Sequence, residues 1–451
     1  MTADLTVLTH ELSDWSTDIA DLTLVSTDRS GSPDAGVPTL VVRARDVAEV
    51  QATARFASGH GIPLVTRGAG SGLAGGAVAG SGSIVLDLSG LDRILEIRPV
   101  DQVAVVEPGV ITADLDAAAA AHGLFYAPDP GSVDISTIGG NIATNAGGLR
   151  GAKYGVTRDA VLALDVVLAD GRLVHLGAGT LKHVTGYDLL GLMVGSEGTL
   201  GIVVGATLRL LPRPAATGTV AAYFGTLEEA AAASVAVRSC GARPSVLEIV
   251  DGATLGAIDD LAATSLRERG EAFLLVQVDG LDVTAELAAV EAAIVGATHV
   301  ESSVDPETSG RLLAARRLAL PAIEAKGRAL IEDIAVPPSR LVEAIRGVYA
   351  VAQDTGTTIH VFAHAGDGNI HPIILVDADA GAELPAAAVE AADRIFALAL
   401  ELGGTVTGEH GVGLLKQAWV ALQAGPDVDA LQRAVKQLLD PAGVLNPGKA
   451  I

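Results

Sequence analysis

Residues 67–75 read RGAGSGLAG, and this glycine-rich stretch decides between two kinds of cofactor-binding domain. It contains a GxGxxG pattern at Gly70, Gly72 and Gly75, which in a Rossmann fold joins a strand to a helix that meets a pyrophosphate. A strand is expected just before it, in the run IPLVTRG (62–68). The next run, GAVAGSGS (76–83), is too rich in glycine to form the helix. The sequence therefore argues against a Rossmann fold and indicates a loop whose backbone N–H groups bind phosphate.

Two further glycine-rich loops follow in the same part of the chain. One runs from Pro130-Gly131-Ser132 to GGNIATNAGG (139–148), and the other is GSEGTLGI (195–202). Each loop alone could be a tight turn of a β-rich domain. Three loops with small, hydroxyl and amide side chains favour instead a long cofactor that contacts the chain at several points.

Composition divides the chain into three parts and predicts an α+β fold. Residues 36–213 alternate short β-branched runs with turn residues, which is typical of many short strands. Residues 216–420 combine alanine-rich helical stretches with strand-like runs, which predicts a helix-backed antiparallel sheet. Residues 421–451 predict one amphipathic helix and a terminus rich in proline and glycine. In the first part, a helix is expected over 111–123, with Thr112 as its N-cap and Gly123 as its end.

Charge and cysteine content exclude several classes of protein. The 451 residues carry a formal net charge of −24, so bulk attraction to nucleic acid or to an anionic membrane is not expected. The single cysteine, Cys240, excludes an internal disulfide and fits a reducing compartment. The acidic N-terminus does not resemble a signal peptide, and no apolar run reaches the roughly 18–20 residues of a membrane span. These features predict a cytoplasmic protein without an integral membrane segment.

Histidines gather in the second part of the chain. Three of the ten lie at 360, 364 and 371, around the turn-like sequence Gly-Asp-Gly-Asn (366–369), and a Glu409-His410 pair follows later. A polar turn between strands would explain the cluster without any ligand. Two imidazoles and a carboxylate, however, are a common set for a divalent metal. We therefore expect His364, His371 and Glu409 to bind zinc, with manganese or iron as alternatives, and expect His360 to be structural.

The ordered motifs RGAGSGLAGG, PGSVDISTIGGNIATNAGG, GAKYG, KHVTGYDL and GSEGTLGI resemble the vanillyl-alcohol oxidase / p-cresol methylhydroxylase (PCMH) superfamily. The resemblance covers nearly the whole chain and is nearest to the branch of D-lactate dehydrogenase, the glycolate oxidase flavoprotein subunit and D-2-hydroxyglutarate dehydrogenase. It implies a PCMH-type FAD-binding domain (36–213), an α+β, ferredoxin-like cap domain with the metal site (216–420), and a C-terminal segment that returns to the FAD domain (421–451). FAD is expected to be non-covalent, because the first loop has no histidine that could tether it. The implied FAD-binding residues are Arg67, Gly68, Ala69, Gly70, Ser71, Gly72, Leu73, Pro130, Gly131, Ser132, Gly139, Gly140, Asn141, Asn145, Gly148, Gly198, Ile202 and Asn446.

The resemblance also implies an activity and its residues. HAGDGNIH resembles the metal loop of the family, with ligands at His364 and His371, and GEHG resembles the segment that provides the ligand Glu409 and the general base His410. Arg316 resembles the arginine that binds the substrate carboxylate. The implied reaction is the oxidation of a small D-2-hydroxy acid to the 2-oxo acid, in which FAD accepts the hydride. A metal makes the hydroxyl easier to deprotonate, and an imidazole with a pKa of about 6.5 suits the proton transfer.

The sequence departs from the D-2-hydroxyglutarate branch where a second substrate carboxylate would need a cation. Residues 318–321 (LALP) and 329–333 (ALIED) are apolar or acidic. This favours D-lactate, with glycolate also compatible. The expected electron acceptor is a quinone, a cytochrome or an electron-transfer flavoprotein, and a homodimer is compatible with the sequence. The alternatives are a flavoprotein subunit of a larger glycolate oxidase, a D-2-hydroxyglutarate dehydrogenase, and a non-catalytic flavin- or metal-binding scaffold.

Overall fold

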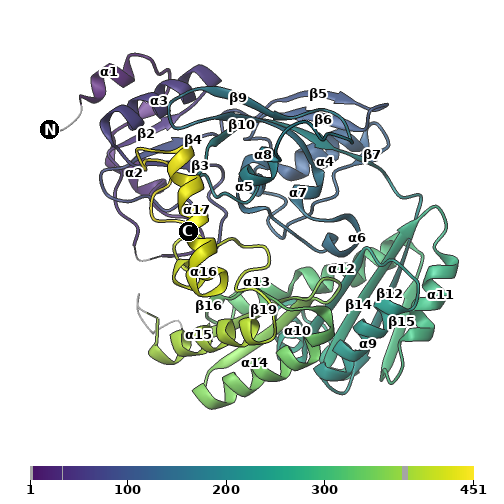
Figure 1. The fold of residues 1–451 in the computed structure, drawn as a ribbon. Helices are drawn as coiled ribbons and strands as arrows, with labels where there is room; N and C mark the ends of the chain where they lie inside the picture. Colours follow the sequence, from purple (N-terminus) through teal and green to yellow (C-terminus); the bar gives the residue numbers. More distant parts are fainter. Residues whose placement is uncertain (1–3, 33, 378–383) are drawn as a thin grey trace. The chain divides into compact units, whose positions relative to one another are not determined.

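The chain forms two compact units in the computed structural model, which describes residues 4–32, 34–377 and 384–451 (Figure 1). The first unit comprises the residues up to Gly147, then Gly155–Arg213 and Glu409–Ile451, and the second comprises Gly148–Tyr154 and Pro214–Gly408. A mixture of helices and strands fills both units, so the expected α+β class is confirmed.

Two small sheets organise the first unit. One has the order β1-β2-β4-β3, and its strands are β1 (Trp15–Ser16), β2 (Leu40–Arg43), β4 (Ile84–Asp87) and β3 (Leu64–Arg67). In it, β4 is parallel to both β2 and β3. The other is antiparallel, with β5 (Ile94–Arg98), β6 (Val103–Val106), β10 (Ile202–Arg209), β8 (Val161–Val167) and β9 (Leu173–Gly177) in that order. A short ribbon pairs β7 (Leu124–Phe125) with β11 (Leu211–Pro212).

Short helices connect and cover these strands. They are α1 (Leu5–Thr9), α2 (Ile19–Leu24), α3 (Val47–His60), α4 (Thr112–Ala120), α5 (Ile138–Thr144), α7 (Thr157–Ala160), α8 (Leu189–Met193), α16 (Gln417–Ala424) and α17 (Pro426–Leu439). Helix α3 shows why they begin and end where they do. The Asp46 side chain accepts a hydrogen bond from the Glu49 N–H at the N-terminus, and Gly61 ends the helix with a φ of +65°.

The expected N-cap of α4 was wrong. The helix begins at Thr112, and Ile111 occupies the N-cap position without a side-chain hydrogen bond to the helix. The Thr112 hydroxyl instead donates to the Ser136 carbonyl and accepts from the Asn141 side chain. A tertiary contact thus replaces the local cap that the sequence favoured.

The C-terminal segment is part of the first unit. The Leu64 N–H of β3 donates to the Val444 carbonyl, and the Asn446 N–H donates to the Leu64 carbonyl. Val435 and Leu439 of α17 pack against the core that surrounds the five-stranded sheet. The last residues thereby lie beside the strand that precedes the first glycine-rich loop.

An antiparallel sheet forms the centre of the second unit. Its order is β15 (His299–Ser303), β12 (Ala216–Phe224), β14 (Ala272–Gly280), β13 (Val246–Asp251), β18 (Thr358–His364), β19 (Asn369–Val376) and β16 (Arg328–Ile331), and β17 (Ile334–Ala335) also pairs with β19. The other elements are α6 (Gly151–Tyr154), α9 (Leu227–Ser239), α10 (Gly252–Ala262), η1 (Arg267–Arg269), α11 (Thr284–Ala293), α12 (Pro306–Arg317), α13 (Ala319–Glu324), η2 (Pro338–Arg340), α14 (Leu341–Thr355) and α15 (Ala386–Glu401).

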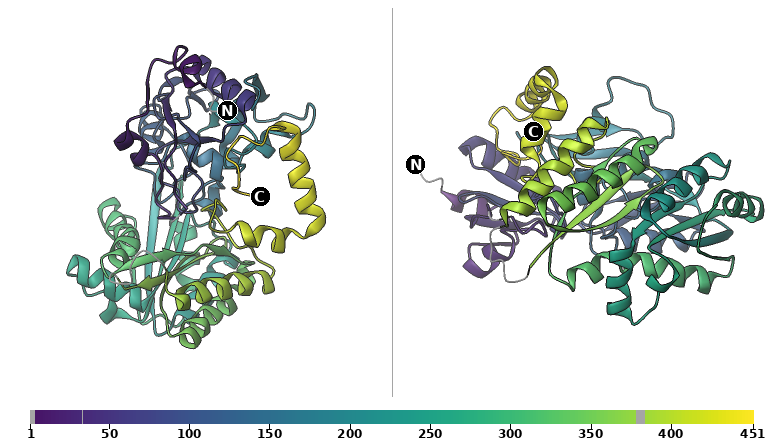
Figure 2. Two further views of the ribbon diagram at one scale, coloured as in Figure 1. Left: turned by 90° about the vertical axis from the view of Figure 1, so that its left-hand side faces the viewer. Right: turned by 90° about the horizontal axis from the view of Figure 1, so that it is seen from below.

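Helices cover both faces of this sheet. Helices α9, α14 and α15 lie side by side across one face (Figures 1 and 2). On the opposite face, α10, α12 and α13 bury apolar side chains such as Leu255, Leu312 and Ile323 against Phe273 and Phe362 of the strands. This second face carries the candidate site, because the side chains of β13, β18 and β19 that point to it include the histidines.

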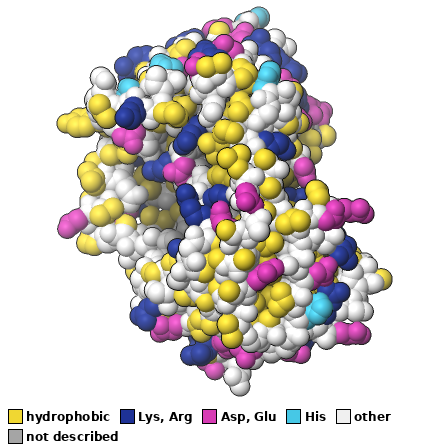
Figure 3. Space-filling model, turned by 90° about the vertical axis from the view of Figure 1, so that its right-hand side faces the viewer, with side chains coloured by type: hydrophobic (Ala, Val, Ile, Leu, Met, Phe, Trp, Pro, Cys, Tyr) yellow, Lys and Arg dark blue, Asp and Glu magenta, His cyan; other side chains and the backbone are white. Residues whose placement is uncertain are grey.

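Acidic, basic and apolar side chains are interspersed on the face drawn in Figure 3. Among the described residues, no helix combines the length and the apolar character that crossing a bilayer requires.

Candidate active site

Strand register brings the two histidines of HAGDGNIH together. Strands β18 and β19 form a hairpin in which His364 pairs with Asn369 and Phe362 pairs with His371. Paired residues and residues two apart share a face of a sheet, so His364 and His371 are diagonal neighbours on one face. Their ring centroids lie 5.0 Å apart, and both side chains are buried. Residues 365–368 form the turn between the two strands.

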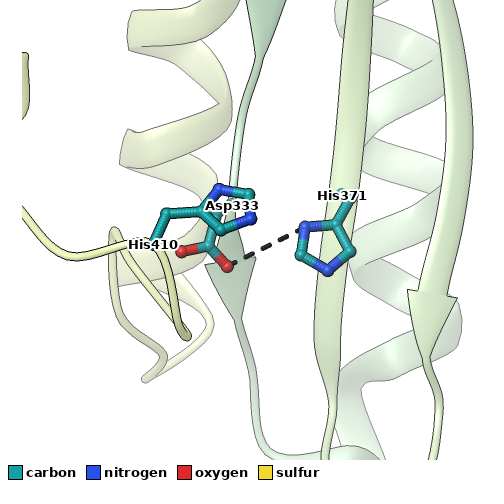
Figure 4. A group of neighbouring side chains, drawn as sticks. All are labelled: Asp333, His371 and His410. Atoms are coloured by element: carbon teal, nitrogen blue, oxygen red, sulfur yellow. Dashed lines mark ion pairs between the residues drawn. The ribbon is translucent and has the colours of Figure 1, made fainter. Parts of the chain in front are cut away.

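Carboxylates stand close to this histidine pair. One possible ligand atom from each of His364, His371 and Glu409 lies within 4.8 Å of the other two. Asp333, His371 and His410 form a second such group, which shares His371 with the first (Figure 4). His371 Nδ1 is 4.0 Å from Asp333 Oδ1. The structure thus places the three expected metal ligands within reach of one ion.

Asp333 fixes the segment that leads to Glu409 and His410. One of its oxygens, Oδ2, accepts hydrogen bonds from the Thr407 hydroxyl at 2.7 Å and from the Gly408 N–H at 2.9 Å. Its other oxygen, Oδ1, accepts from the Asn369 side chain at 2.7 Å. Gly408 is therefore attached to the second unit, and Glu409 and His410 are the next residues of the chain. Sequence reasoning missed Asp333, which it noted only as an acidic residue in ALIED.

Glu248 is a second residue that sequence reasoning missed. Its carboxylate is fully buried in β13, directly opposite His364 in the register. One oxygen is 2.7 Å from His364 Nδ1, and the other accepts from Arg316 Nε at 2.9 Å and Nη2 at 2.8 Å. The only signal in the sequence is a glutamate inside the apolar run VLEIV (246–250). A charge in such a run needs partners, and those partners are two of the predicted site residues.

Arg316 lies on the same face of the sheet as the histidines. It is near the C-terminus of α12, is buried, and stacks over the Phe362 ring at 4.3 Å. His360 lies two residues before Phe362 and contacts the Thr254 hydroxyl at 3.3 Å. Burial lowers the pKa of His360, against the opposing effect of Asp251. This environment agrees with a structural His360.

The first glycine-rich loop leaves the end of β3 without forming a helix. Gly68 lies against the Thr137 hydroxyl at the start of α5, and Gly70 has a φ of +67° beside the Arg67 guanidinium. A side chain at either glycine would collide with these groups. Arg67 donates to the Thr27 carbonyl at 2.6 Å, and burial lowers its pKa. The absence of a helix over 68–83 agrees with the argument against a Rossmann fold.

The second loop continues into α5. Thr137 caps this helix by accepting from the Gly140 N–H, and Asn145 ends it in the left-handed region with a φ of +54°. Gly139 packs closely on Pro108, where a Cβ atom would lie 2.6 Å from the Pro108 Cβ. Asn141 is buried, with its amide on the Thr112 hydroxyl. Among the expected FAD-binding residues, Gly148 lies in the second unit.

The third loop meets the C-terminal tail. The Asn446 side chain donates to the carbonyls of Gly76 and Glu197, at 2.9 and 2.7 Å. The Lys449 ammonium contacts the carbonyls of Gly76 and Val78 and the Asn446 side chain. Ile202 is completely buried in the core around the parallel strands. Within the first unit, the tail therefore ties the first and third glycine-rich loops together.

Comparison with known proteins identifies the family. The family "FAD linked oxidases, C-terminal domain" matches residues 213–450, and "FAD binding domain" matches residues 38–177. The chain belongs to the FAD-linked oxidase family. The glycolate oxidase subunit GlcD of Bacillus subtilis is 40% identical, over 92% of this chain and 89% of its own. A D-lactate dehydrogenase of Archaeoglobus fulgidus is 37% identical, over 93% of each chain.

Solved structures confirm the PCMH-type fold of this FAD-linked oxidoreductase. p-Cresol methylhydroxylase with substrate bound aligns with a TM-score of 0.79 and 17% identity, over 99% of this chain and 96% of its own. The 4-ethylphenol oxidase of Gulosibacter chungangensis aligns with a TM-score of 0.79 and 20% identity, over the same shares. These two structures therefore share the fold of this chain.

Unsatisfied buried atoms at both candidate sites fit groups from outside the chain. Thr66 Oγ1, next to the first glycine-rich loop, has no hydrogen-bond partner among the described residues. Asn369 Oδ1, opposite His364, is likewise buried without a partner in the described part of the chain. Buried polar atoms normally have partners, and a group bound at each site would supply one to these two atoms. The glycine-rich loops fit a phosphate-bearing cofactor, and the imidazole and carboxylate donors fit a divalent metal.

Proposed function

We propose that this protein uses FAD and a divalent metal to oxidise a small D-2-hydroxy acid to the 2-oxo acid. The observation that carries the proposal is the buried His364–His371 pair beside Glu409, in a chain of the FAD-linked oxidase family. The names of the relatives support the substrate class, since they include D-lactate dehydrogenases and glycolate oxidase subunits.

We assign residues to FAD binding, to metal binding and to proton transfer. The three glycine-rich loops and Asn446 would hold FAD without a covalent bond, and the division into an FAD domain, a cap and a C-terminal segment follows from that assignment. His364, His371 and Glu409 would hold the metal, with zinc favoured by the donor set. When bound, the two groups supply a hydride acceptor and a cation that acidifies the substrate hydroxyl. His410, the neighbour of Glu409, would accept the hydroxyl proton.

Arg316 is the proposed partner of the substrate carboxylate. Glu248 takes the Nε–H and one N–H of Nη2, so a substrate carboxylate would bind through the second N–H of Nη2 and the N–H groups of Nη1. Nearby apolar side chains favour a small substrate. Ala319 and Ile323 of α13 are buried in the core, and Glu332 and Asp333 are buried acids where a dicarboxylate would need a cation. D-Lactate is therefore favoured, with glycolate as the second choice, over D-2-hydroxyglutarate.

A second candidate concerns assembly rather than chemistry. Two of the similar relatives, from Bacillus subtilis and Escherichia coli, carry the name glycolate oxidase subunit. This protein would then be the flavoprotein subunit of a larger complex. In either case the electrons would pass to a non-nicotinamide acceptor such as a quinone, a cytochrome or an electron-transfer flavoprotein.

A substrate panel tests the proposal. The purified protein is mixed with D- and L-2-hydroxy acids and an artificial dye acceptor, with and without a chelator. We expect D-selective, chelator-sensitive dye reduction, and loss of turnover in His410→Ala with FAD still bound. Turnover that survives in His410→Ala would show that another group is the base. Flavin reduction by D-lactate under anaerobic conditions, without any partner, would separate a self-sufficient enzyme from a subunit that needs its complex.

A further inference from the structure

The buried carboxylate of Glu248 lies between two elements of the candidate site. It is in the middle of a central strand, with Leu247 and Ile249 on either side, and is fully shielded from solvent. Burial of a charge is costly unless it is paired and hydrogen-bonded. Its partners therefore explain why the sheet tolerates it.

The two oxygens of Glu248 serve two different partners. Oε1 is 2.7 Å from Nδ1 of His364, on the adjacent strand β18. Oε2 accepts from both Nε and Nη2 of Arg316, at 2.9 and 2.8 Å. The Arg316 guanidinium is also held by the Phe362 ring, at 4.3 Å. One carboxylate thus fixes the orientation of an imidazole and of a guanidinium.

The contact with His364 selects one form of its imidazole. A carboxylate on Nδ1 holds the proton there, so that Nε2 is the nitrogen that presents a lone pair. Carboxylate–histidine pairs of this kind orient metal ligands, and their loss typically weakens metal affinity by about 10–100-fold. The contact with Arg316 similarly holds one rotamer of a long side chain, whose Nη1 then has a fixed direction.

We propose that Glu248 is a positioning residue that couples metal binding to substrate binding. It orients the metal ligand His364 through one oxygen and the carboxylate-binding Arg316 through the other. The inference rests on the proposed function, because it takes the roles of His364 and Arg316 from there. It adds that metal affinity and substrate affinity decline together when this single carboxylate is lost.

A purely structural ion pair would behave differently. Removal of such a pair would lower the free energy of unfolding, but the folded variant would bind metal and substrate normally. Glu301 is a matched control, because it lies in β15 of the same sheet and its carboxylate is also shared by two cations, Arg269 and Arg311. It contacts none of the proposed site residues.

The test compares Glu248→Gln, Glu248→Asp and Glu301→Gln with the wild type. Zinc affinity of the metal-free protein is measured by competition with a chromophoric chelator, and KM is measured with D-lactate and a dye acceptor. We expect Glu248→Gln to weaken zinc binding about 10–100-fold and to raise KM for D-lactate at least severalfold, with the flavin absorbance unchanged. Glu301→Gln should match the wild type in both. Glu248→Asp keeps the charge but is one methylene shorter, so it should also lose zinc affinity. It provides the test if Glu248→Gln does not fold.

Double substitution separates the two arms of the coupling. When Arg316 is already replaced by methionine, the further change Glu248→Gln should raise KM little above that of Arg316→Met alone. It should still weaken zinc binding. A folded Glu248→Gln protein, or failing that Glu248→Asp, with wild-type zinc affinity overturns the inference, provided that His364→Ala weakens zinc binding. If His364→Ala also binds zinc like the wild type, the metal site of the proposed function is itself wrong.

Discussion

Replacement of Glu197 by alanine is expected to loosen the segment that carries Glu409 and His410. The buried Glu197 carboxylate accepts the N–H groups of Val412 and Gly413, at 2.7 and 2.8 Å. These two residues follow closely after His410. Glu197→Ala leaves both N–H groups without this acceptor, at a cost of about 1–3 kcal/mol each. The variant no longer buries a charge, which offsets part of this cost, so the expected loss of unfolding free energy is about 2–4 kcal/mol.

Protonation of Glu197 sharpens this prediction. Burial raises the pKa of Glu197, although the two N–H groups oppose the shift. A raised folded-state pKa contributes stability that is present below the unfolded pKa, about 4.5, and that is lost as the pH rises through the folded pKa. The difference in stability between the wild type and Glu197→Ala should therefore be larger at pH 5 than at pH 8. Glu197→Gln, which keeps one acceptor and carries no charge, should cost less than Glu197→Ala.

Urea unfolding followed by tryptophan fluorescence measures these differences. Both tryptophans, Trp15 and Trp419, belong to the first unit, which also contains Glu197 and its partners. Glu96→Ala serves as the control, because Glu96 is exposed on the edge strand β5 and its carboxylate pairs with Arg98 of the same strand. If Glu197→Gln is as costly as Glu197→Ala, or if the difference shrinks on acidification, the carboxylate does not act through these two hydrogen bonds.

Two further substitutions test the loops of the first unit. Lys449→Met removes the ammonium that joins the carbonyls of Gly76 and Val78 to Asn446. Burial lowers the pKa of Lys449 from 10.5 to about 8, so the folded protein loses this proton at a lower pH than the unfolded chain does. In urea unfolding, the wild type should therefore gain stability relative to Lys449→Met as the pH rises from 8 to 10.5. Gly139→Ala places a Cβ 2.6 Å from the Pro108 Cβ, so we expect the free energy of unfolding to fall by about 1–3 kcal/mol. We also expect less FAD per protein, as measured by absorbance. Unchanged FAD content would mean that the loop adapts without disturbing the cofactor.

Local patterns were sufficient to predict much of the fold. The glycine content of residues 76–83 excluded a Rossmann helix, and the structure has none there. The antiparallel, helix-backed sheet of the second part also follows from its texture. The N-cap of α4 failed because Thr112 bonds to Ser136, a contact between residues 24 positions apart in the chain. Helix-capping propensity depends on residues that are close in sequence, so it cannot predict a hydrogen bond to a residue this far along the chain.

The residues of the candidate site were likewise predicted only in part. His364 and His371 are close in sequence, and a hairpin explains their meeting. Glu248 and Asp333 lie far from the histidines in the sequence: the strand register reveals Glu248, and hydrogen bonds to Asn369, Thr407 and Gly408 reveal Asp333. Glu248 looked like a lone acid in an apolar run and Asp333 like one of two adjacent acids, and neither pattern carries information about a partner. Outer residues of a site are for this reason harder to predict than those within a compact motif.

The hairpin turn between His364 and Asn369 sets a strict limit on chain length at this point. Side chains alternate between the two faces of a strand, so a slip of one position would send His371 among the apolar contacts of α14 and α15. A two-residue slip would keep it on the correct face but move it along the strand. Loop exchange or single-residue insertion, which surface connections usually tolerate, would here disconnect the imidazoles from each other while leaving the sheet itself largely intact.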